Sequence, residues 1–226
     1  MPTTAPLRTV VRKLERQYGA PPKPFPTDPF QQVVWENVAY LADDRRRREA
    51  FNSLKGDVGV TPAAIMHAPV ARLRAATSLG ILADRFAGKL REAARIALDE
   101  FGGDLRTVLD LPLPKARRAL RRFPGIGEPG ADKILLFAGR HPLLAPDSNA
   151  LRVLQRLGLA PVARSYAAAY AKARAMAAAQ LGTDTSVMLR AHQLLRRHGQ
   201  ETCTRATPEC SRCLLATTCP RIGVTA

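Results

Sequence analysis

Apolar residues recur every three or four positions along most of the chain, which is the spacing of helices that bury one face. The first such stretch, Leu7–Tyr18, ends at Gly19, and the prolines within residues 21–26 then predict an extended connector. Asp28-Pro29 is typical of a helix start, because aspartate caps free amides and proline suits the first turn.

The same spacing predicts further helices at about 44–55, 61–66, 69–76, 86–101, 104–110, 114–122, 129–138, 148–157, 163–180 and 185–197. The period-two alternation typical of strands is missing. We therefore expect an all-α protein. One arrangement to test is a pair of lobes with a cleft, in which the middle helices form one lobe and the two chain ends form the other.

The composition favours a folded protein, since 46% of the 226 residues are hydrophobic and can fill a core. No stretch approaches the ~20 consecutive apolar residues of a membrane span. Met1–Thr4 lacks the basic start of a signal peptide. We therefore expect a soluble, intracellular protein. Its 35 Lys and Arg against 19 Asp and Glu give a net charge of +16, which predicts a polyanionic partner.

The chain's four cysteines crowd into its last segment, at Cys203, Cys210, Cys213 and Cys219. A disulfide framework is normally spread along a chain, so this clustering indicates a metal. On the softness of thiolate ligands alone, an iron–sulfur cluster and zinc are about equally favoured.

A glycine-bearing turn, Pro124-Gly125-Ile126-Gly127, separates two predicted helices. Gly125 and Gly127 permit a positive φ and close backbone approach, Ile126 suits the core, and the amides at the next helix start suit a phosphate oxygen. An ordinary loop is about as consistent with this motif alone. The basic run before it consists of Lys115, Arg117, Arg118, Arg121 and Arg122, and such runs usually form solvated helix faces.

Further along, Asp147-Ser148-Asn149 leads into a predicted helix. Aspartate before a helix is a preferred N-cap, and on the residues alone capping is the favoured role of Asp147.

The 124–127 turn, the stretch Asp147-Ser148-Asn149-Ala150-Leu151-Arg152-Val153, the pair His198-Gly199 and the four closing cysteines together resemble endonuclease III and its helix-hairpin-helix DNA glycosylase superfamily. The resemblance spans about residues 28–219. It implies a two-lobed helical fold, with residues 1–28 and 141–226 forming one lobe and 29–140 the other, a helix-hairpin-helix at about 114–138, and a catalytic cleft between the lobes.

The resemblance also implies a function. The expected protein is a cytoplasmic, nucleoid-associated, monomeric enzyme of base excision repair that acts on double-stranded DNA with a damaged or mismatched base. Asp147 would be the catalytic carboxylate, and a [4Fe-4S] cluster would bind Cys203, Cys210, Cys213 and Cys219. The implied DNA contacts are Leu41, Gly125, Ile126, Gly127, Lys133 and Arg152.

Two positions depart from the family pattern. Pro129 stands where endonuclease III has the lysine that forms a Schiff base with the sugar, so we expect a monofunctional glycosylase that uses water. Lys133, one helical turn further, is either a displaced nucleophile or a contact to phosphate or solvent. Leu41 replaces the glutamine that fills the space of the flipped base, and an apolar wedge can also fill it. Oxidised-pyrimidine specificity therefore does not transfer.

Alternative functions follow from these departures. Loss of the lysine and of the glutamine is also consistent with a catalytically inactive protein that binds DNA lesions. A glycosylase with lyase activity through Lys133 is another alternative, and a zinc-dependent DNA-binding regulator is a third. Zinc sites usually bring two Cys-x2-Cys pairs, whereas this loop has only one, which favours the iron–sulfur cluster.

Overall fold

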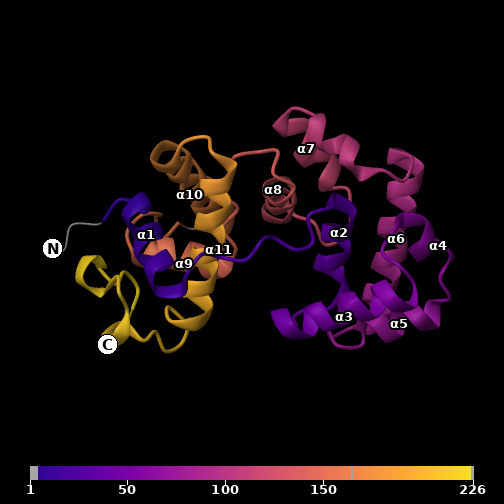
Figure 1. Cartoon of the computed structure of the whole chain (residues 1–226), viewed down its shortest axis with the longest axis horizontal. Helices are drawn as coiled ribbons and strands as arrows, with labels where there is room; N and C mark the ends of the chain where they lie inside the picture. Colours follow the sequence, from indigo (N-terminus) through magenta and orange to yellow (C-terminus); the bar gives the residue numbers. More distant parts are fainter. Residues whose placement is uncertain (1–4, 164, 225–226) are drawn as a thin grey trace. The chain divides into compact units, whose positions relative to one another are not determined.

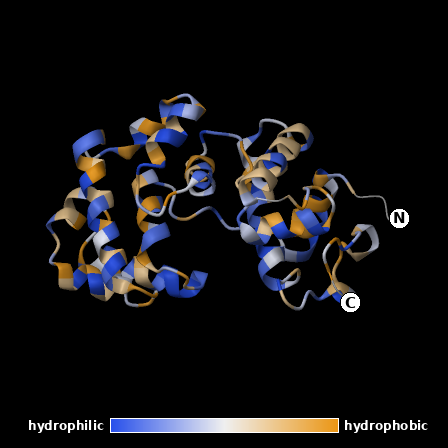
Figure 2. Ribbon diagram, turned by 180° about the vertical axis from the view of Figure 1, so that it is seen from behind, coloured by the Kyte–Doolittle hydropathy of each residue, from blue (hydrophilic) through white to orange (hydrophobic). Residues whose placement is uncertain are grey.

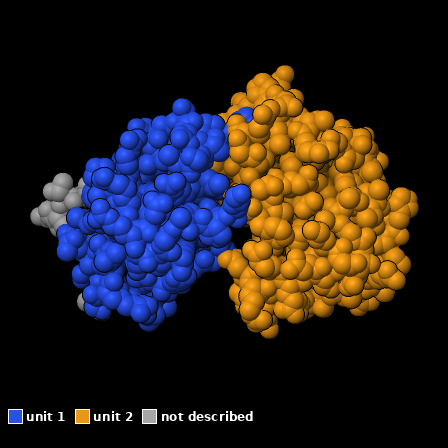
Figure 3. All heavy atoms as spheres, viewed as in Figure 1, with its two compact units in different colours: residues 1–23, 141–226 blue, residues 24–140 orange. Residues whose placement is uncertain are grey.

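The structure is a computed structural model, and it describes residues 5–163 and 165–224. Met1–Thr4, where the sequence argues against a signal peptide, lies outside the described residues. Regular structure in the described part is helical, with no strand, as the apolar spacing predicts (Figure 1). The chain folds into two compact units, residues 1–23 with 141–226 (unit 1) and residues 24–140 (unit 2) (Figure 3).

Unit 2 is built around α6 (Ala83–Phe101), whose buried stripe packs against α4 (Pro62–His67), α5 (Val70–Thr77) and α2 (Pro29–Val38). Helix α3 (Asp44–Asp57) adds Phe51, which meets Trp35 and Phe25 edge to face. A 3₁₀ helix, η1 (Leu105–Asp110), then leads into α7 (Leu113–Leu120) and α8 (Glu128–Phe137). The single tryptophan is thus part of the core, with 8% of its surface exposed.

Unit 1 joins the two ends of the chain. Helix α11 (Thr185–Glu201) packs along α9 (Ser148–Arg156), α10 (Tyr166–Leu181) and α1 (Leu7–Tyr18). The N-terminal helix is tied to the others by hydrogen bonds, because the Leu7 amide donates to Gln180 Oε1 over 2.6 Å and Arg197 donates to the Tyr18 carbonyl over 3.0 Å. Two short 3₁₀ helices, η2 (Cys210–Arg212) and η3 (Ala216–Thr218), form the cysteine loop.

The helices follow the predicted pattern closely, because most begin at a side chain that caps them. Asp28, Thr61, Asp147 and Asp184 each accept a hydrogen bond from an amide of the first helical turn. The predicted helix 163–180 starts at Tyr166, and residue 164 lies outside the described part. Hydrophobic positions run as stripes on these helices (Figure 2), and no described helix is long and apolar enough to cross a membrane.

The largest departure from the pattern is at the end of α11. His198-Gly199 predicts a helix end, yet the helix continues to Glu201 and both residues are buried. A Cβ atom on Gly199 would lie 2.6 Å from the Asn149 carbonyl oxygen. Gly199 therefore does not end the helix. It allows α11 to approach the start of α9 closely, because glycine has no Cβ atom.

Candidate functional site

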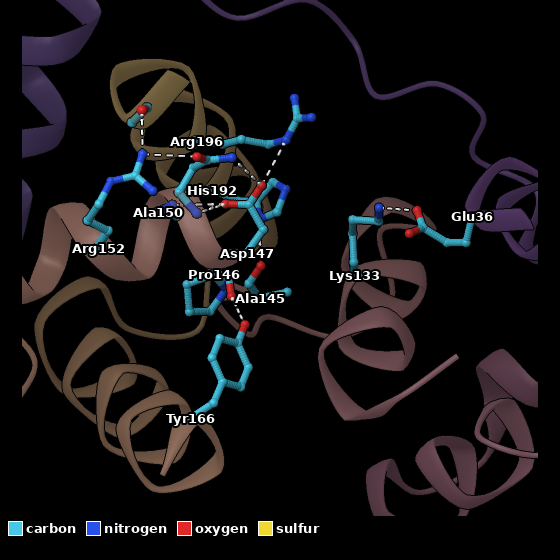
Figure 4. Close-up of polar contacts among 12 residues, drawn as sticks. Glu36, Lys133, Ala145, Pro146, Asp147, Ala150, Arg152, Tyr166, His192 and Arg196 are labelled. Carbon is cyan, nitrogen blue, oxygen red and sulfur yellow. Dashed lines mark hydrogen bonds and ion pairs between the residues drawn. The ribbon is translucent and has the colours of Figure 1, made fainter. Parts of the chain in front are cut away.

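Asp147 lies at the N-terminus of α9, and each of its carboxylate oxygens has a defined partner (Figure 4). Oδ1 accepts hydrogen bonds from the amides of Asn149 at 3.0 Å and Ala150 at 2.8 Å, which confirms the predicted N-cap. Oδ2 accepts a hydrogen bond from Arg196 Nε at 3.0 Å. The side chain is still 32% exposed, so a fixed carboxylate reaches the surface of unit 1.

The residues before Asp147 are held by side chains from two other helices. His192 of α11 donates its Nδ1 proton to the Ala145 carbonyl over 2.8 Å. The Tyr166 hydroxyl of α10 donates to the Pro146 carbonyl over 3.3 Å. The sequence predicts no role for His192, one of four scattered histidines, because its partner is 47 positions away. These contacts fix the backbone that carries the carboxylate.

In unit 2, the predicted hairpin turn forms between α7 and α8. Gly125 has a φ of +78°, so the turn needs a glycine there, and a Cβ atom would lie 2.7 Å from Asn37 Oδ1. Asn37, which is fully buried, donates to the Pro124 carbonyl over 2.9 Å and so attaches the turn to α2. The Ile126 side chain is 5% exposed and packs in the core.

Gly127 is the N-cap of α8, with an extended φ of −87° rather than a positive one. The first intrahelical bond runs from the Ala131 amide to the Gly127 carbonyl over 2.9 Å. The amides before Ala131 have no acceptor within the helix, which is the geometry that suits a phosphate oxygen.

The basic run before the hairpin divides into paired and exposed cations. Arg117 forms a two-pronged ion pair with the fully buried Asp132, which joins α7 to α8. Arg122 pairs with Glu100 at 2.8 Å. In the part of the chain that the structure describes, no carboxylate pairs with the three remaining cations, which are exposed: Lys115, Arg118 and Arg121.

Leu41 follows α2 in a tight turn that turns its side chain outward. Its φ is +57°, and 72% of its surface is exposed. The turn is supported from behind, because the Ile81 amide donates to the Tyr40 carbonyl over 3.1 Å and a Cβ on Gly80 would lie 2.4 Å from the Tyr40 nitrogen. The Tyr40 ring stacks on Phe86, with 4.6 Å between ring centroids.

Two further exposed apolar residues, Ile81 and Leu82, lie beside the Leu41 turn, because the Ile81 amide donates a hydrogen bond to the Tyr40 carbonyl. Each of the two residues is 53% exposed. The sequence alone does not predict a role for this pair. Two apolar residues between helices carry no motif, and only their contact with the Leu41 turn in the structure distinguishes them.

The four cysteines line one pocket of unit 1 and form no disulfide with one another. The Leu215 amide donates to Cys213 Sγ over 3.4 Å, and Arg156 donates to Cys203 Sγ over 3.3 Å. Burial, and to a smaller extent the nearby sulfurs, raise the pKa of the Cys213 and Cys219 thiols. Among the described residues, no three ligand side chains stand close enough together to hold a single metal ion.

His198 lies beside these sulfurs, and burial lowers its pKa to about 4. Its ring is therefore neutral near pH 7, with Nε2 lying 3.6 Å from Cys213 Sγ and Nδ1 lying 2.9 Å from the Tyr18 hydroxyl.

Two arginines of α9 face the loop and hydrogen-bond mainly to carbonyl oxygens. Arg156, only 8% exposed, donates to the Thr204 carbonyl over 2.6 Å and to the Arg205 carbonyl over 3.1 Å. Arg152 Nε donates to the Cys203 carbonyl over 3.0 Å. Because carbonyls do not neutralise these cations, an anionic, thiolate-bound cluster fits both the donor set and the charge of the pocket. The contact of Arg152 with DNA stays a prediction.

No family model matches the chain, but comparison with individual known proteins agrees with the resemblance to endonuclease III. Endonuclease III of Sulfolobus acidocaldarius is 28% identical over 193 residues, covering 84% of this chain and 81% of the relative. Endonuclease III of Escherichia coli K12 is 26% identical over 193 residues, covering 85% and 84%. The chain is thus similar in sequence to endonuclease III over most of its length.

Solved structures show a similar fold. A trapped covalent intermediate of endonuclease III with DNA matches it with a TM-score of 0.78 and 18% identity, covering 95% of this chain and 94% of the other. A thermostable thymine-DNA glycosylase matches with a TM-score of 0.75 and 16% identity, covering 94% of each chain.

The chain departs from the endonuclease III pattern in the first turn of α8. Pro129 lies there and carries no nucleophilic atom. Lys133, one turn later, forms an ion pair with Glu36 of α2, and the two side chains are only 19% and 22% exposed (Figure 4). The Lys133 amine is therefore bound to a carboxylate and largely covered, so it is not free to attack a sugar carbon.

Proposed function

We propose that the chain is a DNA N-glycosylase of base excision repair, which flips a damaged or mismatched base and hydrolyses its N-glycosidic bond. The observation that carries the proposal is the carboxylate of Asp147, fixed at the start of α9 and 32% exposed, in a chain of endonuclease III ancestry. A flipped base is needed because the glycosidic bond is not accessible within the duplex.

Asp147 has the chemistry for this reaction. As the base leaves, positive charge develops on the sugar, and a fixed carboxylate stabilises it electrostatically and orients the attacking water. Because the capping bonds hold Oδ1 and Arg196 holds Oδ2, the charge is in place before the substrate arrives.

The DNA contacts come from unit 2. The amides at the start of α8 bind a backbone phosphate, and the exposed cations Lys115, Arg118 and Arg121 of the 115–122 segment attract the flanking backbone. Leu41 enters the stack in place of the flipped base. It has no polar atom for the orphaned partner base, so it contributes shape and no base-specific hydrogen bond.

The glycosylase is monofunctional. Pro129 cannot form a Schiff base, and Lys133 is engaged by Glu36. Duplexes with thymine glycol, uracil, mismatched thymine, alkylated purines or mismatched adenine, each incubated with the purified protein, test this. We expect breaks at one or more of these bases only after hot alkali. Breaks without alkali that disappear in Lys133→Ala would contradict the monofunctional reaction and favour the alternative with a displaced lysine.

The cysteine loop holds a [4Fe-4S] cluster through Cys203, Cys210, Cys213 and Cys219. When bound, the cluster supplies four strong bonds that fix a segment with few apolar residues of its own. Arg152 and Arg156 hold the loop's backbone against α9. Iron and sulfide analysis of the full chain, with its visible spectrum, tests this assignment. Brown protein is expected, and colourless protein with bound zinc would contradict it.

A second function, lesion binding without catalysis, is favoured by one observation. Pro129 and Leu41 stand where endonuclease III has its reactive lysine and its wedge glutamine, so two groups that act in the family are replaced. If no duplex of the panel is cleaved while binding stays tight and falls with salt, this function replaces the first.

A further inference from the structure

Arg196 lies on the exposed side of α11 and reaches the carboxylate of Asp147 across 49 positions of sequence. Its Nε donates to Asp147 Oδ2 over 3.0 Å, and both side chains are partly buried, at 29% and 32% exposure (Figure 4). Neither the apolar spacing nor the motifs that resemble the family point to this arginine.

We propose that Arg196 is a positioning residue for hydrolysis, which holds the plane of the Asp147 carboxylate in the orientation that the reaction uses. This inference rests on the proposed glycosylase function. Without Arg196, the capping amides still hold Oδ1, but Oδ2 loses its charged partner and the group turns about its Cβ–Cγ bond.

The helix that carries Arg196 is itself placed for this contact. His192, one turn before Arg196, donates a hydrogen bond to the Ala145 carbonyl. Two successive turns of α11 therefore bind the segment that contains Ala145 and Asp147. Three residues after Arg196, Gly199 lets the helix approach Asn149 closely, and Arg152 donates to the Gly199 carbonyl over 2.6 Å. Loop and helix therefore form one rigid support, which is the condition for a precise position of a reacting group.

The charge of Arg196 distinguishes this role from a neutral support. A guanidinium donates a charge-assisted hydrogen bond to Oδ2, which is stronger than a bond from a neutral donor and so fixes the carboxylate plane more firmly. A direct contact of Arg196 with a DNA phosphate is the competing role, and it predicts a different measurement, since phosphate contacts change affinity and its salt dependence.

The test compares Arg196→Met and Arg196→Lys with the wild-type chain, and uses Arg190→Met as a matched control. Arg190 lies on the same helix and pairs with Glu15 at 3.4 Å, away from Asp147. Single-turnover rates are measured at saturating protein on a duplex that the wild type cleaves, and Kd is measured on an uncleavable abasic-site analogue at several salt concentrations. Melting temperatures verify that each variant is folded.

We expect Arg196→Met to lower the saturated rate by about 10- to 100-fold, the loss that a misplaced reacting group causes, with Kd changed less than about threefold, well under the ~1.4 kcal/mol of a tenfold change. Arg196→Lys restores part of the rate, because it keeps the charge, and Arg190→Met matches the wild type.

Three outcomes would overturn the inference. An unchanged or higher saturated rate in Arg196→Met means that Arg196 does not support the reaction. A weaker affinity with a salt slope reduced by about one, at an unchanged saturated rate, assigns Arg196 to a phosphate. A wild-type chain that cleaves no duplex removes the proposed function and this inference together, whereas the first two outcomes remove the inference alone.

Discussion

The regions around Asp147 in unit 1 and Lys133 in unit 2 each contain an acid paired with a base, and they suit opposite chemistry. The Asp147–Arg196 pair stands at a helix start, with both side chains about one-third exposed. The Lys133–Glu36 pair stands in the body of α8, with both side chains about one-fifth exposed. The proposed hydrolysis uses the carboxylate of the first pair in its charged form, whereas covalent catalysis through the second pair would need its amine in the neutral form.

An ion pair thus has a different consequence in each region. It orients the carboxylate of Asp147, which the proposed hydrolysis uses as a fixed charge, whereas it occupies the amine of Lys133, which would have to be free to attack a sugar carbon. Together with Pro129 in the first turn of α8, this difference supports the proposed hydrolysis by water over covalent catalysis.

The strongest test of the comparison is Asp147→Asn. Asparagine caps a helix about as well as aspartate, so the melting temperature should change little. The saturated rate should fall about 10³-fold, because the substituted amide neither carries a negative charge nor accepts the proton of water. Single-turnover cleavage and thermal melting measure the two effects. A rate within tenfold of the wild type would remove Asp147 from the reaction.

The hairpin region contains a third ion pair, Arg117–Asp132, to which we assign a structural role only. Asp132 is fully buried against Arg117, so Asp132→Ala leaves a guanidinium without its partner and should lower the free energy of unfolding by about 3–5 kcal/mol. Asp110→Ala, which breaks the exposed pair with Arg140, is the control and should cost less than about 1 kcal/mol. Equal losses in urea titrations would show that Asp132 does not fix the hairpin.

The smallest expected effect belongs to the Leu41 wedge. Leu41→Ala shortens the side chain that fills the vacated stack, and should weaken binding to abasic-site duplex by about three- to tenfold, since the lost contact amounts to about 1 kcal/mol at about 0.8 kcal/mol per buried CH₂ group. Binding to undamaged duplex should change less. Val162→Ala, at an equally exposed position of unit 1, is the control. A loss that is equal on both duplexes would assign Leu41 to general DNA affinity.

Much of the fold follows from the sequence because its signals are local. The apolar spacing and capping side chains such as Asp28 and Asp147 lie within the helices they define. The resemblance adds Asp147 and the four cysteines. Arg196, His192 and Asn37 could not be found this way, because each acts on a residue 47 or more positions away and carries no local pattern. Gly199 was misread as a helix end for the same reason, since its close contact is with another helix.

Borohydride trapping tests the central claim most directly. A Schiff base between protein and abasic sugar is reduced to a stable covalent complex, whereas hydrolysis by water leaves none. With a duplex that the wild type cleaves after hot alkali, we predict no trapped complex, and the same result for Lys133→Met. A trapped complex in the wild type that is lost in Lys133→Met would contradict the account, because it would show that the amine paired with Glu36 attacks the sugar.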